Sequence, residues 1–384
     1  MKKNFFALFF AALALSACSS DDSASFQRVE KSNLSAVEQA ALSFVGSIDG
    51  SLSSRGNVVS TLSVKSIKQV NSKSTLTRGA QNDSTAYSLY MVSLNENKGL
   101  VLVAEKKGLV NPIGYFPKEN GLEPNNIVKI DTTTHEFNGI VKIGKDEYEN
   151  SSTADQETLD FNWRQYEKID KKLKPKCKVF WYQCPPYNRY CFTKDGVSAV
   201  AGCVAIAGAQ ALTVLRPQTD MISSWDEAVK DFPSEQVIDE IAHFVSYIGK
   251  TINTCYGTEY SSADPNGLIP LFSRYGIKYY GEKILFRALD SPHGVIIVSA
   301  CRKNKYQEYV GHAFIADGYI KYRRSIHSCY LHINYGWGEL DQPKYKDAYI
   351  LCSDKTWEPP MNANDRIYPY FVKFYSFAYP EEMK

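Results

Sequence analysis

The sequence lacks a strong net charge and the common metal-binding motifs. Its 384 residues carry 44 Lys and Arg against 42 Asp and Glu, a formal charge of +2. Binding to nucleic acid or to anionic membranes relies on an excess of positive charge, so no nucleic-acid partner is expected. Cys-x-x-Cys and His-Glu-x-x-His spacings are absent, and His327 and His332 are interpreted as ordinary strand residues rather than metal ligands. We expect neither a metal nor an organic cofactor.

The apolar run Phe5–Leu15 is too short to span a bilayer as a mature helix. Two lysines precede it, and small residues follow it up to Cys18. This pattern is typical of a bacterial lipoprotein signal, and the alternative is an ordinary secretory signal with an incidental cysteine. We expect residues 1–17 to be the signal peptide and 18–33 a tether lipidated at Cys18. The protein would then be an exported, outer-membrane or cell-surface lipoprotein, from which a mature form could be released.

The next part of the chain predicts a small α+β domain over residues 34–150. Ser35 and Glu38 can form a capping box, and apolar residues recur at helical spacing up to Val45. Two strand-like runs, 86–94 and 99–104, are separated by four turn-forming residues and predict a hairpin. A third run, 110–116, contains a proline and is interpreted as an edge strand.

Residues 151–178 are interpreted as an exposed junction. The segment 155–173 is charged and predicts a helix, and lysines gather at its end. A charge run is often only a solvated face, but flexible polar connections are also preferred sites of proteolytic cleavage. We expect processing within this segment.

The second half predicts helices followed by an antiparallel sheet, an α+β arrangement. Residues 235–248 place apolar side chains on one helical face, whereas 295–299, 312–319 and 330–335 have the pattern of strands. We expect one domain over residues 179–384.

A candidate nucleophile lies in the stretch Gly202-Cys203-Val204-Ala205-Ile206-Ala207-Gly208. A cysteine at a helix N-terminus is favoured as the thiolate, the form that attacks carbonyls. The alternative is a buried, inert cysteine in a helix of small residues. If Cys18 is lipidated and Cys203 is catalytic, seven of the nine cysteines remain. An odd number cannot all pair, so we infer no disulfide framework.

Three further segments favour the catalytic interpretation: Trp181-Tyr182-Gln183-Cys184, Gly311-His312-Ala313-Phe314 and His332-Ile333-Asn334-Tyr335-Gly336-Trp337-Gly338. With the cysteine they give the order Gln, Cys, His, Asn. Order and spacing resemble the streptopain family of papain-like cysteine proteases over essentially the whole chain. The resemblance implies a papain-like catalytic domain preceded by a small α+β prodomain that acts as an intramolecular inhibitor.

Acyl transfer to a cysteine needs four functions, and each has a candidate. Cys203 is the nucleophile and His312 the base. Asn334 could accept the imidazole N–H and fix the orientation of the ring. Gln183 could donate its side-chain amide to the oxyanion beside the N–H of Cys203, and Trp337 could shield the contact between His312 and Asn334.

The resemblance also implies that Ser262 and Gly311 line the substrate cleft. Two departures from the family are evident: Tyr335 replaces a tryptophan, and the loop 301–310 is rich in lysine and tyrosine rather than glycine. We expect an exported cysteine endopeptidase made as a zymogen, acting on protein or peptide substrates and attached to the membrane by its lipid. The alternatives are a catalytically impaired binding or inhibitory protein of the same fold, and a thiol acyltransferase or amidase.

Overall fold

A computed structural model of the chain describes residues 35–49, 62–70, 88–95, 98–106, 109–117, 169–281, 284–303, 309–322, 329–338, 347–352 and 372–384. The expected signal peptide and the lipidated tether lie outside these residues. Among the helices described, none has both the length and the apolar character needed to cross a membrane.

The described residues of the N-terminal part form one helix and four strands. They are α1 (Ala36–Asp49), β1 (Val64–Val70), β2 (Ser88–Leu94), β3 (Leu100–Lys106) and β4 (Leu109–Phe116). The capping box is confirmed, because Ser35 N–H donates to the Glu38 carboxylate at 2.7 Å and Glu38 N–H to Ser35 Oγ at 3.3 Å. The predicted hairpin is confirmed as β2 and β3, which pair antiparallel.

The C-terminal part begins with a strand and continues with helices and then a sheet. Its helices are α4 (Cys203–Leu215), α5 (Trp225–Ala228), α6 (Glu235–Thr251), η3 (Pro265–Gly267), α7 (Leu268–Ser273), α8 (Leu285–Asp290) and η4 (Pro380–Met383). Its strands are β5 (Ile169–Leu173), β6 (Lys278–Gly281), β7 (Val295–Lys303), β8 (Tyr309–Tyr322), β9 (Cys329–Asn334), β10 (Asp347–Cys352) and β11 (Val372–Ala378). The predicted α+β class is therefore confirmed.

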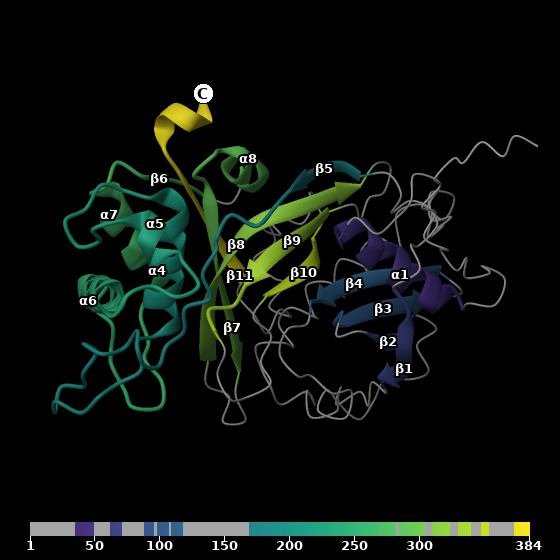
Figure 1. Cartoon of the computed structure of the whole chain (residues 1–384), viewed down its shortest axis with the longest axis horizontal. Helices are drawn as coiled ribbons and strands as arrows, with labels where there is room; N and C mark the ends of the chain where they lie inside the picture. Colours follow the sequence, from purple (N-terminus) through teal and green to yellow (C-terminus); the bar gives the residue numbers. More distant parts are fainter. Residues whose placement is uncertain are drawn as a thin grey trace, which may run out of the picture.

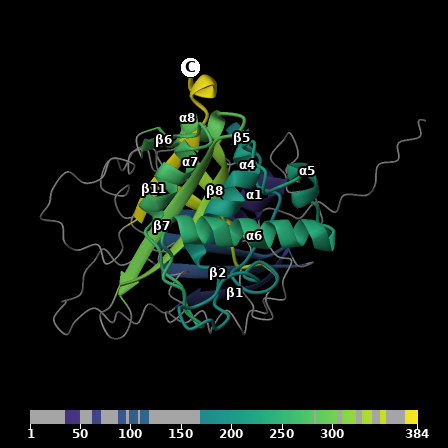
Figure 2. The same cartoon turned by 90° about the vertical axis from the view of Figure 1, so that its left-hand side faces the viewer.

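All the described strands form one sheet. Its order is β1-β2-β3-β4-β10-β9-β8-β7-β11-β6, and β5 pairs with the end of β8. In Figure 1 the helices α4 to α7 lie on one side of the long strands β7 and β8, and the N-terminal strands lie at the opposite end of the molecule. Figure 2 shows α6 running across the face that the helices cover.

The predicted edge position of β4 is wrong, since β4 pairs with β3 on one side and with β10 on the other. Pro112 is tolerated because β10 pairs only with Gly114 and Tyr115, beyond the proline. The proline itself faces β3 next to an irregularity in the register. The two parts of the chain thus share a sheet through two residue pairs.

The helix predicted over residues 155–173 is not present at its C-terminal end, where Ile169–Leu173 forms β5 and pairs with β8. Hydrogen bonding to β8 decides the conformation there, because tertiary pairing overrides a weak local preference. The rest of that predicted helix lies outside the described residues.

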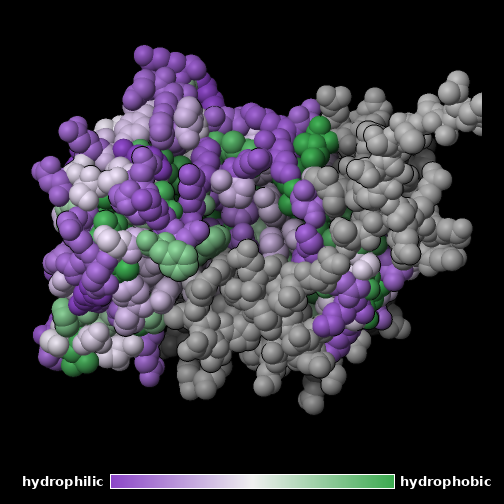
Figure 3. Space-filling model, viewed as in Figure 1, coloured by the Kyte–Doolittle hydropathy of each residue, from purple (hydrophilic) through white to green (hydrophobic). Residues whose placement is uncertain are grey.

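Two large hydrophobic cores stabilise the described part of the fold. One joins α1 and the N-terminal strands to residues of β8, β9 and β10, and the other lies between α4, α6, α7 and the opposite face of the sheet. Phe44 of α1 is fully buried, with its ring 4.3 Å from that of Tyr330 and 6.4 Å from that of Tyr322. The face of the molecule in Figure 3 is mostly hydrophilic where described, with small hydrophobic areas between.

Candidate active site

Cys203 is the first residue of α4, as predicted. Gly202 precedes it with a φ of +89°, and a Cβ there would lie 3.3 Å from Cβ of Ser261. Both the backbone conformation and the space therefore favour glycine. The rest of α4 is buried whereas Cys203 is only half-buried, so its thiol lies where the helix reaches the surface. The N–H groups of the first turn and the positive dipole end of α4 are directed toward this position.

Two segments flank the approach to Cys203. Ala201 N–H donates to the Gln183 carbonyl at 2.8 Å, so the segment that contains Gln183 runs beside the residues before the thiol. On the other side, Val200 N–H donates to the Gly257 carbonyl at 3.1 Å. Ser262 is exposed in the same loop and pairs through its backbone with Cys255. Gln183 and Ser262 thus lie on segments around the thiol, and their roles stay predictions.

His312 lies near the start of β8, with Gly311 exposed beside it. The imidazole is buried and its Nε2 lies 2.9 Å from the Tyr335 carbonyl oxygen. Because a carbonyl can only accept, Nε2 carries the hydrogen in this contact and Nδ1 is left as the basic nitrogen of the neutral ring. The fold therefore selects a tautomer in which Nδ1 can take a proton.

Trp337 covers the imidazole. Its ring stacks on that of His312 with the centroids 5.2 Å apart, and on the Tyr335 ring at 4.5 Å. The sequence predicts that Trp337 shields a contact between His312 and Asn334, and the structure places its ring on His312. The Tyr335 side chain is buried in this stack, while its main-chain carbonyl holds the imidazole.

The expected hydrogen bond between His312 and Asn334 is not made. Asn334 is 1% exposed, and its Nδ2 donates to the Val179 carbonyl at 2.8 Å. Its Oδ1 accepts the Gly336 N–H at 3.1 Å. The register of the sheet explains this, because Asn334 pairs with Ile315, three residues further along β8 than His312.

Asn334 nevertheless acts on His312 indirectly, through a peptide group that both side chains contact. The peptide group between Tyr335 and Gly336 donates its N–H to Asn334 and accepts a hydrogen bond from His312. Asn334 therefore fixes the peptide that orients the imidazole. Gly336 has a φ of +69° and Gly338 a φ of +57°, and a Cβ at Gly338 would lie 2.1 Å from the Tyr182 ring, so this turn requires glycine.

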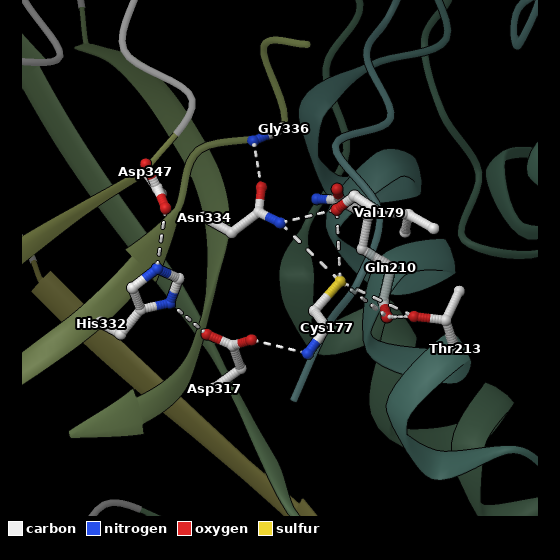
Figure 4. A network of polar contacts seen from close by, with 9 residues as sticks. All are labelled: Cys177, Val179, Gln210, Thr213, Asp317, His332, Asn334, Gly336 and Asp347. Atoms are coloured by element: carbon white, nitrogen blue, oxygen red, sulfur yellow. Dashed lines mark hydrogen bonds and ion pairs between the residues drawn. The ribbon is translucent and has the colours of Figure 1, made fainter. Parts of the chain in front are cut away.

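A buried polar network that sequence reasoning did not predict lies next to this turn (Figure 4). His332 Nδ1 contacts Asp317 Oδ1 at 2.6 Å, and its Nε2 contacts Asp347 Oδ2 at 3.1 Å. The other Asp317 oxygen accepts the Cys177 N–H at 2.7 Å. His332 is therefore no ordinary strand residue, because it joins β8, β9 and β10 to the segment that contains Cys177.

The network perturbs two titratable groups. Burial alone would lower the pKa of His332, but Asp317 and Asp347 outweigh burial and raise it to about 9. Burial and the nearby Asp317 raise the pKa of the Cys177 thiol to about 12. Cys177 is therefore an inert thiol at neutral pH. Among the residues the structure describes, no group of His, Cys, Asp and Glu could hold a metal ion.

The helix with Cys203 packs directly against the strand with His312, since α4 contacts both β8 and β7. The arrangement supplies a thiol at a helix N-terminus and an imidazole of defined tautomer under a tryptophan. Peptide N–H groups at the start of α4 are available for a developing oxyanion. These are the parts needed for acyl transfer to sulfur.

Comparison with known proteins finds one matching family model. Residues 218–343 match the model of the peptidase C10 family. Among solved structures, the chain is similar to a prointerpain A fragment from Prevotella intermedia, with 16% identity, a TM-score of 0.45 and coverage of 74% of this chain and 98% of that one. It is also similar to the active interpain A cysteine protease of Prevotella intermedia, with 20% identity, a TM-score of 0.35 and coverage of 48% and 96%. No curated protein sequence matches.

Proposed function

We propose that the chain is a cysteine endopeptidase zymogen in which Cys203 is the nucleophile and His312 the base, since residues 218–343 match the peptidase C10 family. The matched range contains His312 but begins after Cys203. The observation that supports Cys203 is its place at the exposed start of a buried helix that packs against β8.

In the proposed reaction, His312 Nδ1 takes the thiol proton and the Cys203 sulfur attacks the peptide carbonyl. The carbonyl oxygen becomes an oxyanion held by the N–H of Cys203 and by the side-chain amide of Gln183. Nδ1 then returns the proton to the leaving amine as the C–N bond breaks. Water, deprotonated by the same nitrogen, attacks the thioester and releases the acid with a free thiol.

Asn334 and Trp337 support the base in this scheme. Asn334 fixes the peptide whose carbonyl binds Nε2, and Trp337 excludes water from one face of the imidazole. The departure at Tyr335 does not weaken the scheme, since the contact with His312 is made by its main chain. Nothing in the geometry favours the binding-protein or acyltransferase alternatives over hydrolysis.

We propose that residues 34–150 inhibit the enzyme until the chain is cut, and that the cut falls in 151–168. Lys176 argues against a cut further along, since its ammonium donates to the carbonyls of Leu289, Ser291 and Gly294 at 2.5 to 2.8 Å. The residues around Lys176 are thereby anchored to the catalytic part. A protease cleaves segments that can enter its active site, and these anchored residues cannot readily do so.

Export and lipidation at Cys18 remain part of the proposal and rest on the signal pattern alone. The proposed location is the outer membrane or the cell surface. In the proposed enzyme, Ser262 and Gly311 line the cleft that binds the substrate. The prodomain and protein substrates would be its partners.

The test compares wild-type and Cys203→Ala precursors that lack the signal peptide. Wild type is expected to shorten itself within residues 151–168 and then to degrade casein, whereas Cys203→Ala stays full length until active enzyme is added. N-terminal sequencing locates the cut. A Cys203→Ala protein that matures at the wild-type rate without added protease would show that Cys203 does not make the cut. A stable wild type without activity on casein would favour the binding protein.

A further inference from the structure

Gln210 is a fully buried polar side chain in the middle of α4. It follows Cys203 by seven residues, or about two helical turns, so both side chains lie along one face of the helix. Its neighbours in α4 are almost all apolar or small. Burying an amide in such a helix is unfavourable unless its polar atoms are bonded.

Only one end of this amide is bonded. Gln210 Oε1 accepts the Trp181 N–H at 3.0 Å. Its Nε2 is buried and has no hydrogen-bond partner within the described part of the chain. An apolar side chain of similar size would avoid the free-energy cost of burying this unbonded amide nitrogen. Packing alone therefore does not explain a glutamine here.

The hydrogen bond to Trp181 fixes the segment that contains Gln183. Two residues beyond Trp181, the Gln183 carbonyl accepts the N–H of Ala201, which lies two residues before Cys203. The segment is thus bonded at Trp181 to the middle of α4 and at Gln183 to the residues just before Cys203. Removing the Trp181 contact would loosen the segment two residues before Gln183.

The same carboxamide also borders the turn that orients the base. A Cβ at Gly336 would lie 3.3 Å from Gln210 Nε2 and 3.1 Å from Ile206 Cγ2. The carbonyl of Tyr335, which binds His312, belongs to the peptide that ends at Gly336. Gln210 therefore lies between the segment of the oxyanion donor and the turn of the base.

We propose that Gln210 is a positioning residue, whose carboxamide sets the segment bearing Gln183 against the helix bearing Cys203. This inference rests on the proposed function, because it concerns the geometry of peptide hydrolysis. Gln210 touches neither the substrate nor the reacting atoms and acts through Trp181 and Gln183.

The test uses the full-length chain, processed by a trace of tagged wild-type enzyme that is then removed. Gln210→Met keeps the size of the side chain but loses the acceptor for Trp181 N–H. It is expected to lower kcat by about 10- to 100-fold with little change in KM, as misplacement of an oxyanion donor does. The rate at which iodoacetamide alkylates Cys203 should stay within about twofold of wild type, since alkylation forms no oxyanion.

Two further variants separate positioning from stability. Thr213→Val removes a buried hydroxyl one turn further along α4, which donates to the Gln210 carbonyl at 2.7 Å, and should lower Tm while kcat is retained. Gln210→Glu keeps an oxygen for Trp181 and should regain most of the lost kcat at mildly acidic pH, where a buried carboxyl is protonated.

A double-mutant cycle with Gln183→Ala completes the test. If Gln210 acts through Gln183, the double variant is no slower than Gln183→Ala alone. Wild-type kcat in Gln210→Met, or fully additive effects in the cycle, would overturn the inference and leave the proposed function standing. Unaltered hydrolysis by Cys203→Ala would instead overturn the proposed function, and the inference with it.

Discussion

The buried contact between His332 and Asp317 makes the stability of this fold depend on pH in the alkaline range. An unfolded histidine has a pKa near 6.5, whereas the pKa of His332 in the fold is about 9. A raised pKa stabilises the fold fully at pH values below 6.5, and the stabilisation is lost as the pH rises through 9. Since one pKa unit corresponds to about 1.4 kcal/mol, the protonated imidazole contributes about 3 kcal/mol.

The perturbation is His332→Gln, made in a Cys203→Ala background so that the chain does not digest itself. Glutamine can still donate to Asp317 but carries no charge at any pH. Between pH 6 and pH 10 the wild-type side chain should lose about 3 kcal/mol of unfolding free energy relative to the variant. Urea denaturation at several pH values measures both proteins.

A second group titrates in this range with the opposite sign. Burial lowers the pKa of Lys176 to about 8, so above pH 8 the unfolded chain binds more protons and stability rises with pH. Lys176 is present in both proteins, and its contribution cancels in the difference. Asp317→Asn should weaken the same dependence, because Asp347 alone then opposes the burial that lowers the pKa of His332. Parallel stability curves for wild type and His332→Gln would refute the reasoning.

Three other predictions concern the anchor, the thiol and the prodomain. Cys18→Ser should move the protein from the membrane to the soluble fraction, and an unchanged fractionation would contradict lipidation. At mildly acidic pH iodoacetamide should label Cys203 first while Cys177 stays unlabelled, because burial raises the pKa of the Cys177 thiol. Peptide mapping identifies the labelled thiol, and labelling of another cysteine first would exclude Cys203 as the nucleophile. Phe44→Ala should lower the free energy of unfolding, measured by urea denaturation, by about 3 to 5 kcal/mol, since it leaves a cavity beside Tyr330. The same substitution should speed processing of the active precursor. A loss below about 1 kcal/mol would mean that α1 does not hold the two parts together.

The local elements follow from the sequence where a local signal exists. The capping box at Ser35 starts α1, the turn residues after Leu94 close the hairpin, and the apolar face of residues 235–248 gives α6. The segment Gly202–Cys203 marks the start of α4 because glycine takes the positive φ that precedes the helix. These patterns involve residues only a few positions apart, and so they are visible in the chain.

Partners that are distant in the chain were decided by the tertiary structure. The motif that contains Asn334 predicted its importance, but the pairing of β8 with β9 directs its side chain toward Val179 and leaves His312 to the Tyr335 carbonyl. Likewise, no local pattern around β4 predicts its pairing with β10.

The sequence by itself therefore determined the residue types of the reaction, the thiol, the imidazole and the amides, because chemistry depends on the side chain alone. Only the folded chain decided which atom of each residue meets which partner. His332 looks ordinary in the sequence and becomes a buried cation when the sheet places Asp317 and Asp347 on either side of it. The physical reason is that burial and hydrogen-bond geometry, which set charge and tautomer, arise from residues that only packing brings together.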